Sequence, residues 1–389
     1  MKVCVVTPWY PDRVHAFAGI FVRQQVDALR EAGVEVEVEV AVRHLAPPNG
    51  RADAALKSLD HLASRDPSAV YGTDPSVSYI PSFEAPRIGF AGRAEAFRNA
   101  LQIKRKHRPI DADVVHAHVA LPAGYAALRF DDRRPVVVTE HFTGLSRVLS
   151  QADAADAYRS VVEDSAYFAF VSRSLSDVLA ERFPDLGPKA ELTPNIVDLR
   201  EIPFRSRSVV GKRWLYVGNL TETKGIKLLL RSFSRHHATN RKSTLTVVGQ
   251  GPLQAWAEQF IERHALADAV AMVGSVDHAD LGPYFDEADL LVHLSELETF
   301  GISTMEAIGA GLPVINLDNG AAREVWGEIE PAVGRILPLD ADEVAVCGAV
   351  DDLRGSTSLD PATGRSFVEH RFSPQTVAQH LIMTYEGVL

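Results

Sequence analysis

The chain has 389 residues, of which 46% are hydrophobic and 23% charged, and its formal net charge is −11. This composition is typical of a folded globular protein, and the length suffices for two domains that each bury a core. The negative charge argues against a general role in binding nucleic acid or an anionic membrane surface. Cys4 and Cys347 are too few for a disulfide framework or a cysteine metal cluster, which fits a reducing cytoplasm.

The first residues predict a strand and its loop rather than a signal peptide, because Trp9, Tyr10 and Pro11 closely follow a short apolar run. The sequence has no apolar run of about 18 residues, so we expect no transmembrane segment. We expect a cytoplasmic protein and leave peripheral contact with a membrane open. The basic run 104–108 is interpreted as cations at a helix C-terminus before Pro109 rather than as a phosphate-docking patch.

Strands alternate with helices twice along the chain. The first half predicts strands at 2–8, 34–42, 113–118, 135–141 and 167–172, with helices at 19–33, 121–130 and 175–183. The second half predicts strands at 212–218, 243–249, 269–274, 289–294, 312–317 and 334–339, with helices such as 223–236 and 253–266. Apolar runs joined by amphipathic stretches indicate parallel sheets that helices cover on both faces.

Two doubly wound α/β domains are therefore expected. We place an N-terminal Rossmann-like domain at 1–205, a C-terminal Rossmann-like domain at 206–370, and a C-terminal helix that can pack back on the first domain at 371–389. The boundary falls in the Pro- and Ser-rich stretch 193–211. Residues 45–92 show little periodicity and are interpreted as a long irregular excursion. Parallel sheets bind ligands at the carboxyl ends of their strands, so two facing sheets predict a cleft.

The loop after strand 212–218 ends in Lys224 and Gly225, where a helix is expected to begin. A lysine beside free helix amides predicts a diphosphate site. Gly249 and Gly251 follow the next strand. Their G-x-G lacks the third glycine of a dinucleotide fingerprint, so we interpret it as a tight turn with close backbone approach.

Glu298 and Glu306 lie around the start of a helix expected near residue 302. Gly301 would let a phosphate or sugar approach the free N–H groups of that helix, and a carboxylate can accept two hydrogen bonds from a vicinal diol. Alternatively, the two glutamates only favour a helix N-terminus, at about 0.3 to 1 kcal/mol each. Together with Lys224 they favour the ligand-binding interpretation.

Three histidines lie near predicted strand ends. His118 is a candidate for contact with substrate, and Glu140 and His141 are acceptor-side candidates. For His116 we expect a core role, with its side chain on the opposite face of the strand.

We expect no metal site and no cofactor. Asp111 and Asp113 precede a strand, which places them at the wrong end of the sheet, and we interpret them as a turn. A Rossmann oxidoreductase is disfavoured because neither half has a full G-x-G-x-x-G with a suitably spaced acid.

Six ordered segments resemble one known family. They are FAGIFVRQQVDAL, DVVHAH, TPNIVD, VGNLTETKG, VVGQGP and ETFGISTMEA, the last with an E-x7-E motif. Together they resemble glycosyltransferase family 4, the retaining GT-B enzymes that use nucleotide-sugar donors. The similarity covers nearly the whole chain and implies a GT-B fold, in which two Rossmann-like domains face each other across a cleft. It also implies that the domain at 1–205 binds the acceptor and the domain at 206–370 the donor.

The resemblance also implies roles for particular residues. Lys224 would bind the donor diphosphate, Glu298 the hydroxyls of the donor sugar, and Glu306 the ribose hydroxyls. Catalytic roles are implied for His118, Lys224 and Glu298. Donor contacts are implied for Gly19, Asn219, Lys224, Gly249, Glu298, Phe300, Gly301, Ile302 and Glu306.

Two positions depart from the family pattern. Asn219 stands where the family usually carries an arginine, so one cationic phosphate contact is missing. Ala18 precedes Gly19 where the family has paired glycines, which narrows the backbone freedom there.

The resemblance implies a metal-independent, retaining hexosyltransferase that works on one face of the donor without a covalent enzyme intermediate. The donor is expected to be a UDP-sugar, with a GDP-sugar as the second option. The acceptor would be a hydroxyl of a saccharide, a lipid-linked saccharide or a small molecule such as a natural product. The alternatives are a nucleotide-sugar epimerase of GT-B fold and a non-catalytic nucleotide-sugar-binding subunit.

Overall fold

The computed structural model describes residues 1–12, 18–45, 74–84, 88–107, 111–130, 134–186, 190–207 and 209–389. The chain forms two compact units, one of Met1–Pro194 with Val377–Leu389 and one of Asn195–Thr376. The division falls before Asn195 rather than after residue 205, because Val197 and Ile202 pack in the core of the second unit. The Val197 amide also donates to the Phe372 carbonyl at 2.8 Å.

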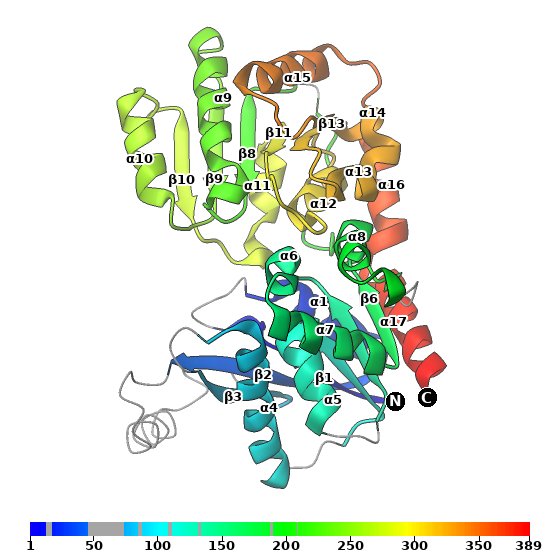
Figure 1. The fold of residues 1–389 in the computed structure, drawn as a ribbon. Coiled ribbons are helices and arrows are strands. Elements are labelled where there is room, and N and C mark those ends of the chain that lie inside the picture. Colours follow the sequence, from blue (N-terminus) through cyan, green and yellow to red (C-terminus); the bar gives the residue numbers. More distant parts are fainter. Residues whose placement is uncertain are drawn as a thin grey trace. The chain divides into compact units, whose positions relative to one another are not determined.

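The first unit is built on a seven-stranded sheet with the order β3-β2-β1-β4-β5-β6-β7, in which every neighbouring pair is parallel (Figure 1). Its strands are β1 (Lys2–Thr7), β2 (Glu35–Leu45), β3 (Val77–Glu84), β4 (Val114–His118), β5 (Val136–Glu140), β6 (Tyr167–Phe170) and β7 (Ala190–Leu192). The central strands β4 and β5 are buried along their whole length, which explains their unbroken apolar runs.

Helices connect these strands and supply the large core side chains, among them Phe97 and Tyr158. The helical elements are α1 (Ile20–Glu31), α4 (Phe90–His107), the π-helical turn η1 (Ala120–Gly124), α5 (Tyr125–Phe130), α6 (Leu145–Leu149), α7 (Ala152–Asp164), α8 (Arg173–Arg182), η2 (Pro184–Leu186) and α17 (Pro374–Val388). Most of α17 belongs to this unit, and the Tyr385 hydroxyl lies 2.7 Å from His116 Nδ1 on β4.

The second unit repeats the design with a six-stranded parallel sheet of order β10-β9-β8-β11-β12-β13 (Figure 1). Its strands are β8 (Arg213–Val217), β9 (Thr244–Val248), β10 (Val270–Gly274), β11 (Leu290–His293), β12 (Val314–Leu317) and β13 (Gly334–Leu337). The helical elements are η3 (Glu222–Lys224), α9 (Ile226–Thr239), α10 (Gln254–Arg263), η4 (His278–Asp280), α11 (Gly282–Glu287), α12 (Ile302–Gly309), α13 (Ala321–Trp326), η5 (Gly327–Ile329), α14 (Glu330–Val333), α15 (Glu343–Gly355) and α16 (Pro361–Phe372). Two doubly wound parallel sheets are thus present, as the sequence predicts.

The expected irregular excursion over residues 45–92 is wrong in part. β3 (Val77–Glu84) pairs in parallel with β2 along its whole length, and α4 begins at Phe90. The strand is hard to predict because it is an edge strand with Pro81 in its middle, a position where a missing N–H is tolerated. Residues 46–73 and 85–87 of the excursion lie outside the described residues.

The basic run 104–108 begins in the last turn of α4, which ends at His107, so the expected helix C-terminus is confirmed there. Arg108 and Pro109 lie outside the described residues. Lys104 pairs with Glu39, a buried carboxylate on β2. This lysine therefore has an internal partner.

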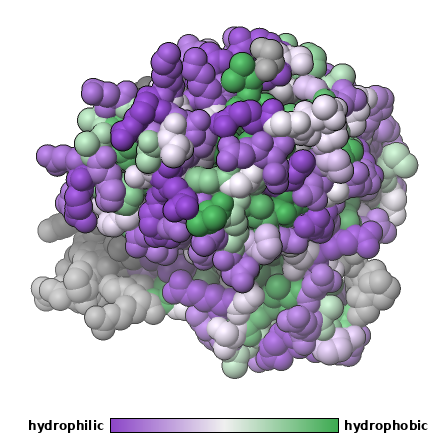
Figure 2. All heavy atoms as spheres, turned by 90° about the horizontal axis from the view of Figure 1, so that it is seen from above, coloured by the Kyte–Doolittle hydropathy of each residue, from purple (hydrophilic) through white to green (hydrophobic). Residues whose placement is uncertain are grey.

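The surface is largely hydrophilic where Figure 2 shows it, and the hydrophobic residues visible there form small separate groups. The large exposed apolar side chains of the second unit include Val344 on α15, which is 54% exposed, and Leu339 after β13. In the parts of the chain that the structure describes, no helix is both long enough and apolar enough to cross a membrane.

Candidate active site

Lys224 and Glu298 meet at the carboxyl edge of the second sheet. Lys224 ends the turn η3 that follows β8, and Glu298 lies in the loop after β11, the strand that pairs with β8. The Lys224 Nζ is 2.6 Å from Glu298 Oε2, and both side chains are mostly buried. Lys224 and Glu298 thus form an ion pair although they lie 74 positions apart in the sequence. The resemblance implies that they contact the diphosphate and the sugar of one donor.

His293 completes this pair, although the sequence reasoning did not select it. It is the last residue of β11, and its Nε2 lies 3.5 Å from Glu298 Oε2. The buried imidazole stacks on Tyr216 with ring centroids 5.7 Å apart. The Tyr216 hydroxyl in turn donates to the Asn219 carbonyl at 2.9 Å. The position of His293 at the end of a strand, on the same sheet edge as Lys224, is the sequence signal that could have identified it.

The surroundings of Glu298 favour its ionised form. Burial raises the pKa of the carboxyl group, but the contact with His293 and the charge of Lys224 outweigh burial and bring the pKa to about 2. The carboxylate is therefore a permanent hydrogen-bond acceptor at neutral pH.

This depressed pKa predicts a pH-dependent stability contribution. The folded-state value lies below the ordinary 4.5, so Glu298 stabilises the protein fully above pH 4.5 and loses that contribution as the pH falls toward about 2. The difference in unfolding free energy between wild type and Glu298→Gln should therefore shrink on acidification through this window. Urea denaturation at a series of pH values measures it, and a difference independent of pH would contradict the assigned charge.

Glu306 is held by a second histidine. Its side chain projects from α12 and is only 2% exposed, and its Oε1 lies 2.5 Å from His278 Nε2. His278 begins the turn η4, which follows β10 at the same edge of the sheet. Sequence reasoning did not find His278, because its segment carries no recognisable motif.

The start of α12 lies between the two glutamates. Gly301 is its N-cap with φ 84°, so the helix begins at Ile302 as predicted. The Phe300 side chain is buried and packs edge-to-face on Phe372, with centroids 5.1 Å apart. The Phe300 side chain therefore belongs to the core, so the expected donor contact of this residue would have to come from its backbone amide.

Gly249 has a conformational role that the sequence anticipates. A Cβ at this position would lie 1.9 Å from the Gly218 carbonyl oxygen, and its φ is 135°. The close approach lets the loops after β8 and β9 run side by side, and the Leu220 amide donates to the Gln250 carbonyl at 3.0 Å. Asn219 belongs to the first of these loops.

Replacing Gly249 by alanine should lower the free energy of unfolding by about 2 kcal/mol or more, because both the backbone conformation and the contact resist a side chain. Gly348→Ala is the matched control. Gly348 lies within α15 with no atom within 4 Å of its would-be Cβ, and alanine there should stabilise by about 0.5 to 1 kcal/mol. Chemical denaturation compares the two, and equal effects would contradict the role of Gly249.

In the first unit, His118 and His141 lie together at the carboxyl edge of the sheet. His118 Nδ1 is 3.0 Å from His141 Nε2, and both rings are buried. Burial and the nearby histidines hold the pKa of His118 well below its usual value, so the ring is neutral at physiological pH. Its Nε2 has no hydrogen-bond partner among the described residues and is free to bond a ligand.

Gly19 caps the adjoining helix α1, where a Cβ would lie 2.2 Å from the Trp9 carbonyl oxygen. Phe21 in the first turn of α1 packs on His141, with centroids 4.5 Å apart. The structure therefore brings the start of α1 next to His141, so Gly19 and the histidine pair lie in the same part of the first unit.

His116 corrects one expectation and confirms another. Its ring lies 4.4 Å from that of His118, so both side chains project from the same face of β4. The expected opposite face is wrong, because residues two apart on a strand share a face. The core role is confirmed, since the ring nitrogens contact the Tyr385 and Thr139 hydroxyls at 2.7 and 2.8 Å.

Glu140 faces the interior of the first unit. Its carboxylate accepts hydrogen bonds from the amides of Ala120, His141 and Phe142 and from the Tyr158 hydroxyl, all between 2.8 and 3.1 Å. Burial raises the pKa of this group, while these donors lower it. Four internal donors favour a structural role over the expected acceptor-side contact. His141 remains an acceptor-side candidate.

Asp111 and Asp113 lie at the amino edge of the first sheet, where the turn interpretation places them. The Asp111 carboxylate is 2.6 Å from Lys2 Nζ, and Asp113 accepts from the Lys2 amide at 2.8 Å. Both contacts secure the starts of β1 and β4.

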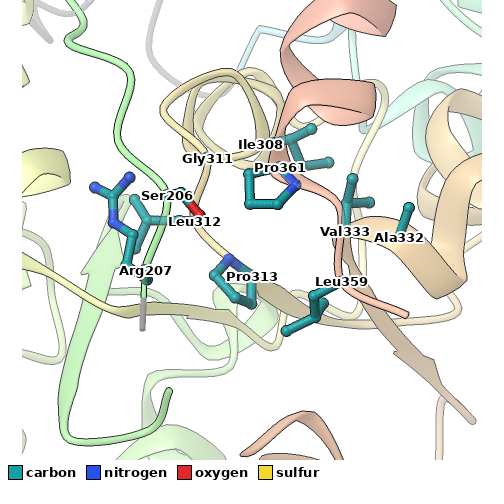
Figure 3. Close-up of a pocket in the computed structure, with 10 residues that line it drawn as sticks. All are labelled: Ser206, Arg207, Ile308, Gly311, Leu312, Pro313, Ala332, Val333, Leu359 and Pro361. Atoms are coloured by element: carbon teal, nitrogen blue, oxygen red, sulfur yellow. The ribbon is translucent and has the colours of Figure 1, made fainter. Parts of the chain in front are cut away.

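A small cavity in the second unit, shown in Figure 3, lies near the amino end of β12, away from the carboxyl edge that carries Lys224. Leu312 and Pro313, which precede β12, line it together with Ile308 and Val333. Its volume of about 60 Å³ is far below that of a ligand pocket. The cavity therefore does not compete with the Lys224 site as a place for a nucleotide.

Two doubly wound units, with Lys224 and Glu298 in loops at the strand ends of the second and Glu306 in the helix that follows, define a glycosyltransferase of GT-B fold. Two family models support this class. The model described as "Glycosyltransferase Family 4" matches residues 18–201, and that described as "Glycosyl transferases group 1" matches residues 201–338. The chain belongs to glycosyltransferase family 4.

Similar proteins include a glycogen synthase of Mycobacterium tuberculosis, 29% identical over 348 residues that cover 83% of this chain and 80% of the relative. Among solved structures, sucrose-phosphate synthase from Thermosynechococcus elongatus has a TM-score of 0.76 at 20% identity, covering 100% of this chain and 99% of its own. Anabaena HepE in complex with UDP has a TM-score of 0.70 at 17% identity, covering both chains completely. At these identities the solved structures support the fold.

Proposed function

We propose that this protein is a retaining glycosyltransferase that moves a sugar from a UDP-sugar, or as second option a GDP-sugar, to an acceptor hydroxyl. The observation that carries the proposal is the Lys224–Glu298 ion pair at the carboxyl edge of the second sheet, with Glu306 in the helix that follows. UDP in the crystal structure of the similar HepE supports a uridine donor.

The proposed mechanism assigns each charge to a part of the donor. Lys224 and the amides at the start of α12 stabilise the negative charge that grows on the diphosphate as the bond to the anomeric carbon breaks. Glu298 accepts hydrogen bonds from the sugar, and Glu306 from the ribose. We propose that Lys224 and these amides serve the leaving group without a metal ion.

The acceptor side is proposed to lie at the carboxyl edge of the first sheet. His118 is neutral, so it offers the reacting sugar a hydrogen bond rather than a charge. The donor phosphate accepts the proton of the attacking hydroxyl on the same face, which retains the anomeric configuration without a covalent enzyme intermediate. A saccharide, a lipid-linked saccharide or a small natural product fits as acceptor.

A thermal-shift screen with UDP-, GDP- and dTDP-sugars tests the donor, and proton NMR of the product formed on a panel of hydroxyl acceptors tests the configuration. We expect stabilisation by one nucleotide class and a product with the donor's anomeric configuration. An inverted product would overturn the retaining mechanism, and binding of no donor would overturn the proposed function. An isomerised donor formed without acceptor would identify an epimerase instead.

A further inference from the structure

The contact between His278 and Glu306 joins two segments that no motif connects. His278 lies in η4 after β10, whereas Glu306 lies in the middle of α12, 28 residues later. The Nε2–Oε1 distance is 2.5 Å, and the side chains are 19% and 2% exposed. The imidazole is thus the more accessible partner of an otherwise buried carboxylate.

This contact leaves Glu306 able to bind a diol. A carboxylate offers about four lone-pair directions on its two oxygens, and one nitrogen occupies a single direction on Oε1. Two hydroxyl groups can still be accepted, provided that the carboxylate plane is fixed. A histidine bonded to one oxygen fixes that plane, as the second partner of a metal-binding or catalytic side chain often does.

A second acidic residue nearby is already engaged. Asp198 pairs with Arg200 through a contact of 2.6 Å. Burial raises the pKa of Asp198, but Arg200 and the charge of His278 bring it below its usual value. Asp198 thus has Arg200 as a cationic partner, while His278 lies within hydrogen-bond distance of Glu306.

Space for a nucleoside lies beside η4. An open hollow of about 610 Å³ is lined by Ser275, Asp277, Asp280 and Tyr284, two of which flank or belong to the turn of His278. Its carboxylates repel phosphate but accept hydrogen bonds from neutral N–H and O–H groups. This chemistry fits the nucleoside end of the donor, while Lys224 fits the diphosphate.

We propose that His278 is a positioning residue for the donor ribose, holding Glu306 so that its carboxylate accepts both ribose hydroxyls. The inference rests on the proposed function and adds a residue outside the family motifs to the same site. His278 acts through Glu306, so its loss should raise the donor KM with little change in kcat.

Calorimetric titration of UDP and 2′-deoxy-UDP, or of GDP and 2′-deoxy-GDP if guanosine is preferred, tests the inference. His278→Ala should weaken UDP binding about tenfold, the worth of a hydrogen bond to a charged group, and weaken 2′-deoxy-UDP binding about threefold or less, because one of the two oriented hydroxyls is then missing. His278→Gln, whose amide can still donate, should recover most of the affinity.

His264→Ala is the matched control, because His264 is an exposed histidine of the same unit that contacts the Phe260 carbonyl at 2.9 Å. It should bind both nucleotides as wild type does. Equal weakening of both nucleotides by His278→Ala, wild-type affinity of that variant, or no recovery in His278→Gln would each overturn the inference. A wild-type protein that binds neither UDP nor GDP would instead overturn the proposed function on which it rests.

Discussion

Replacing Lys224 by alanine should lower the rate of glycosyl transfer by about 100- to 1000-fold, the usual effect of removing one preorganised charge from a transition state. The lysine Nζ lies 2.6 Å from Glu298, so the variant also leaves that carboxylate without its closest cation. The loss should fall mainly on kcat, because charge grows on the diphosphate as the bond breaks. Steady-state kinetics with the donor identified by the screen measures it.

Lys227→Ala is the matched control for this variant. Lys227 lies three residues further along, in the first turn of α9, and pairs with Glu222 at 2.8 Å. This partly exposed ion pair contributes little to stability, and Lys227 has no proposed contact with the donor, so the variant should keep nearly all activity. Comparable losses in both variants would mean that the loop needs its total charge rather than Lys224 itself, and full activity of Lys224→Ala would end the site assignment.

Replacing Glu140 by alanine should destabilise the first unit by about 3 kcal/mol or more. The change removes the acceptor of three backbone amides, two of them buried, and of the buried Tyr158 hydroxyl, and each buried donor left unsatisfied costs about 1 to 3 kcal/mol. Urea denaturation followed by circular dichroism measures the loss, which should appear in the transition of the unit that contains β5.

Glu163→Ala provides the comparison on the surface. Glu163 pairs with Arg159 one turn away on α7, and its side chain is 45% exposed. Its loss should cost less than about 0.5 kcal/mol. If Glu140→Ala were as stable as Glu163→Ala yet failed to use the acceptor, Glu140 would have the acceptor-side role that its hydrogen bonds disfavour.

The fold could be predicted from the sequence because its pattern is local. The apolar runs of β1, β4 and β5 reflect strands buried on both faces, and Gly225 and Gly301 precede α9 and α12 at the expected positions. β3 was not predicted, because this edge strand shows little alternation of polar and apolar residues and contains Pro81. The division before Asn195 was not predicted, because it depends on the hydrophobic core in which Val197 and Ile202 pack, and the local sequence does not reveal this.

The site could be predicted only where a segment carries its own chemistry. Lys224, Glu298 and Glu306 lie in short motifs, and the structure brings the first two into contact. His278 and His293 lie in segments without a motif, and their importance comes from partners that folding supplies. Glu140 shows the converse limit, since its strand-end position predicts a place in the cleft, whereas its oxygens accept hydrogen bonds from internal donors that only the folded structure reveals.

The ion pair between Lys224 and Glu298 has a consequence for turnover. On the proposed roles, binding of a sugar nucleotide breaks the contact between the two side chains. Lys224 then binds the phosphates, and Glu298 accepts hydrogen bonds from the sugar hydroxyls. The nucleoside diphosphate product can still bind Lys224, but it has no sugar whose hydroxyls could bond to Glu298. The protein should therefore favour departure of the by-product, because re-forming its own internal contact helps to expel it.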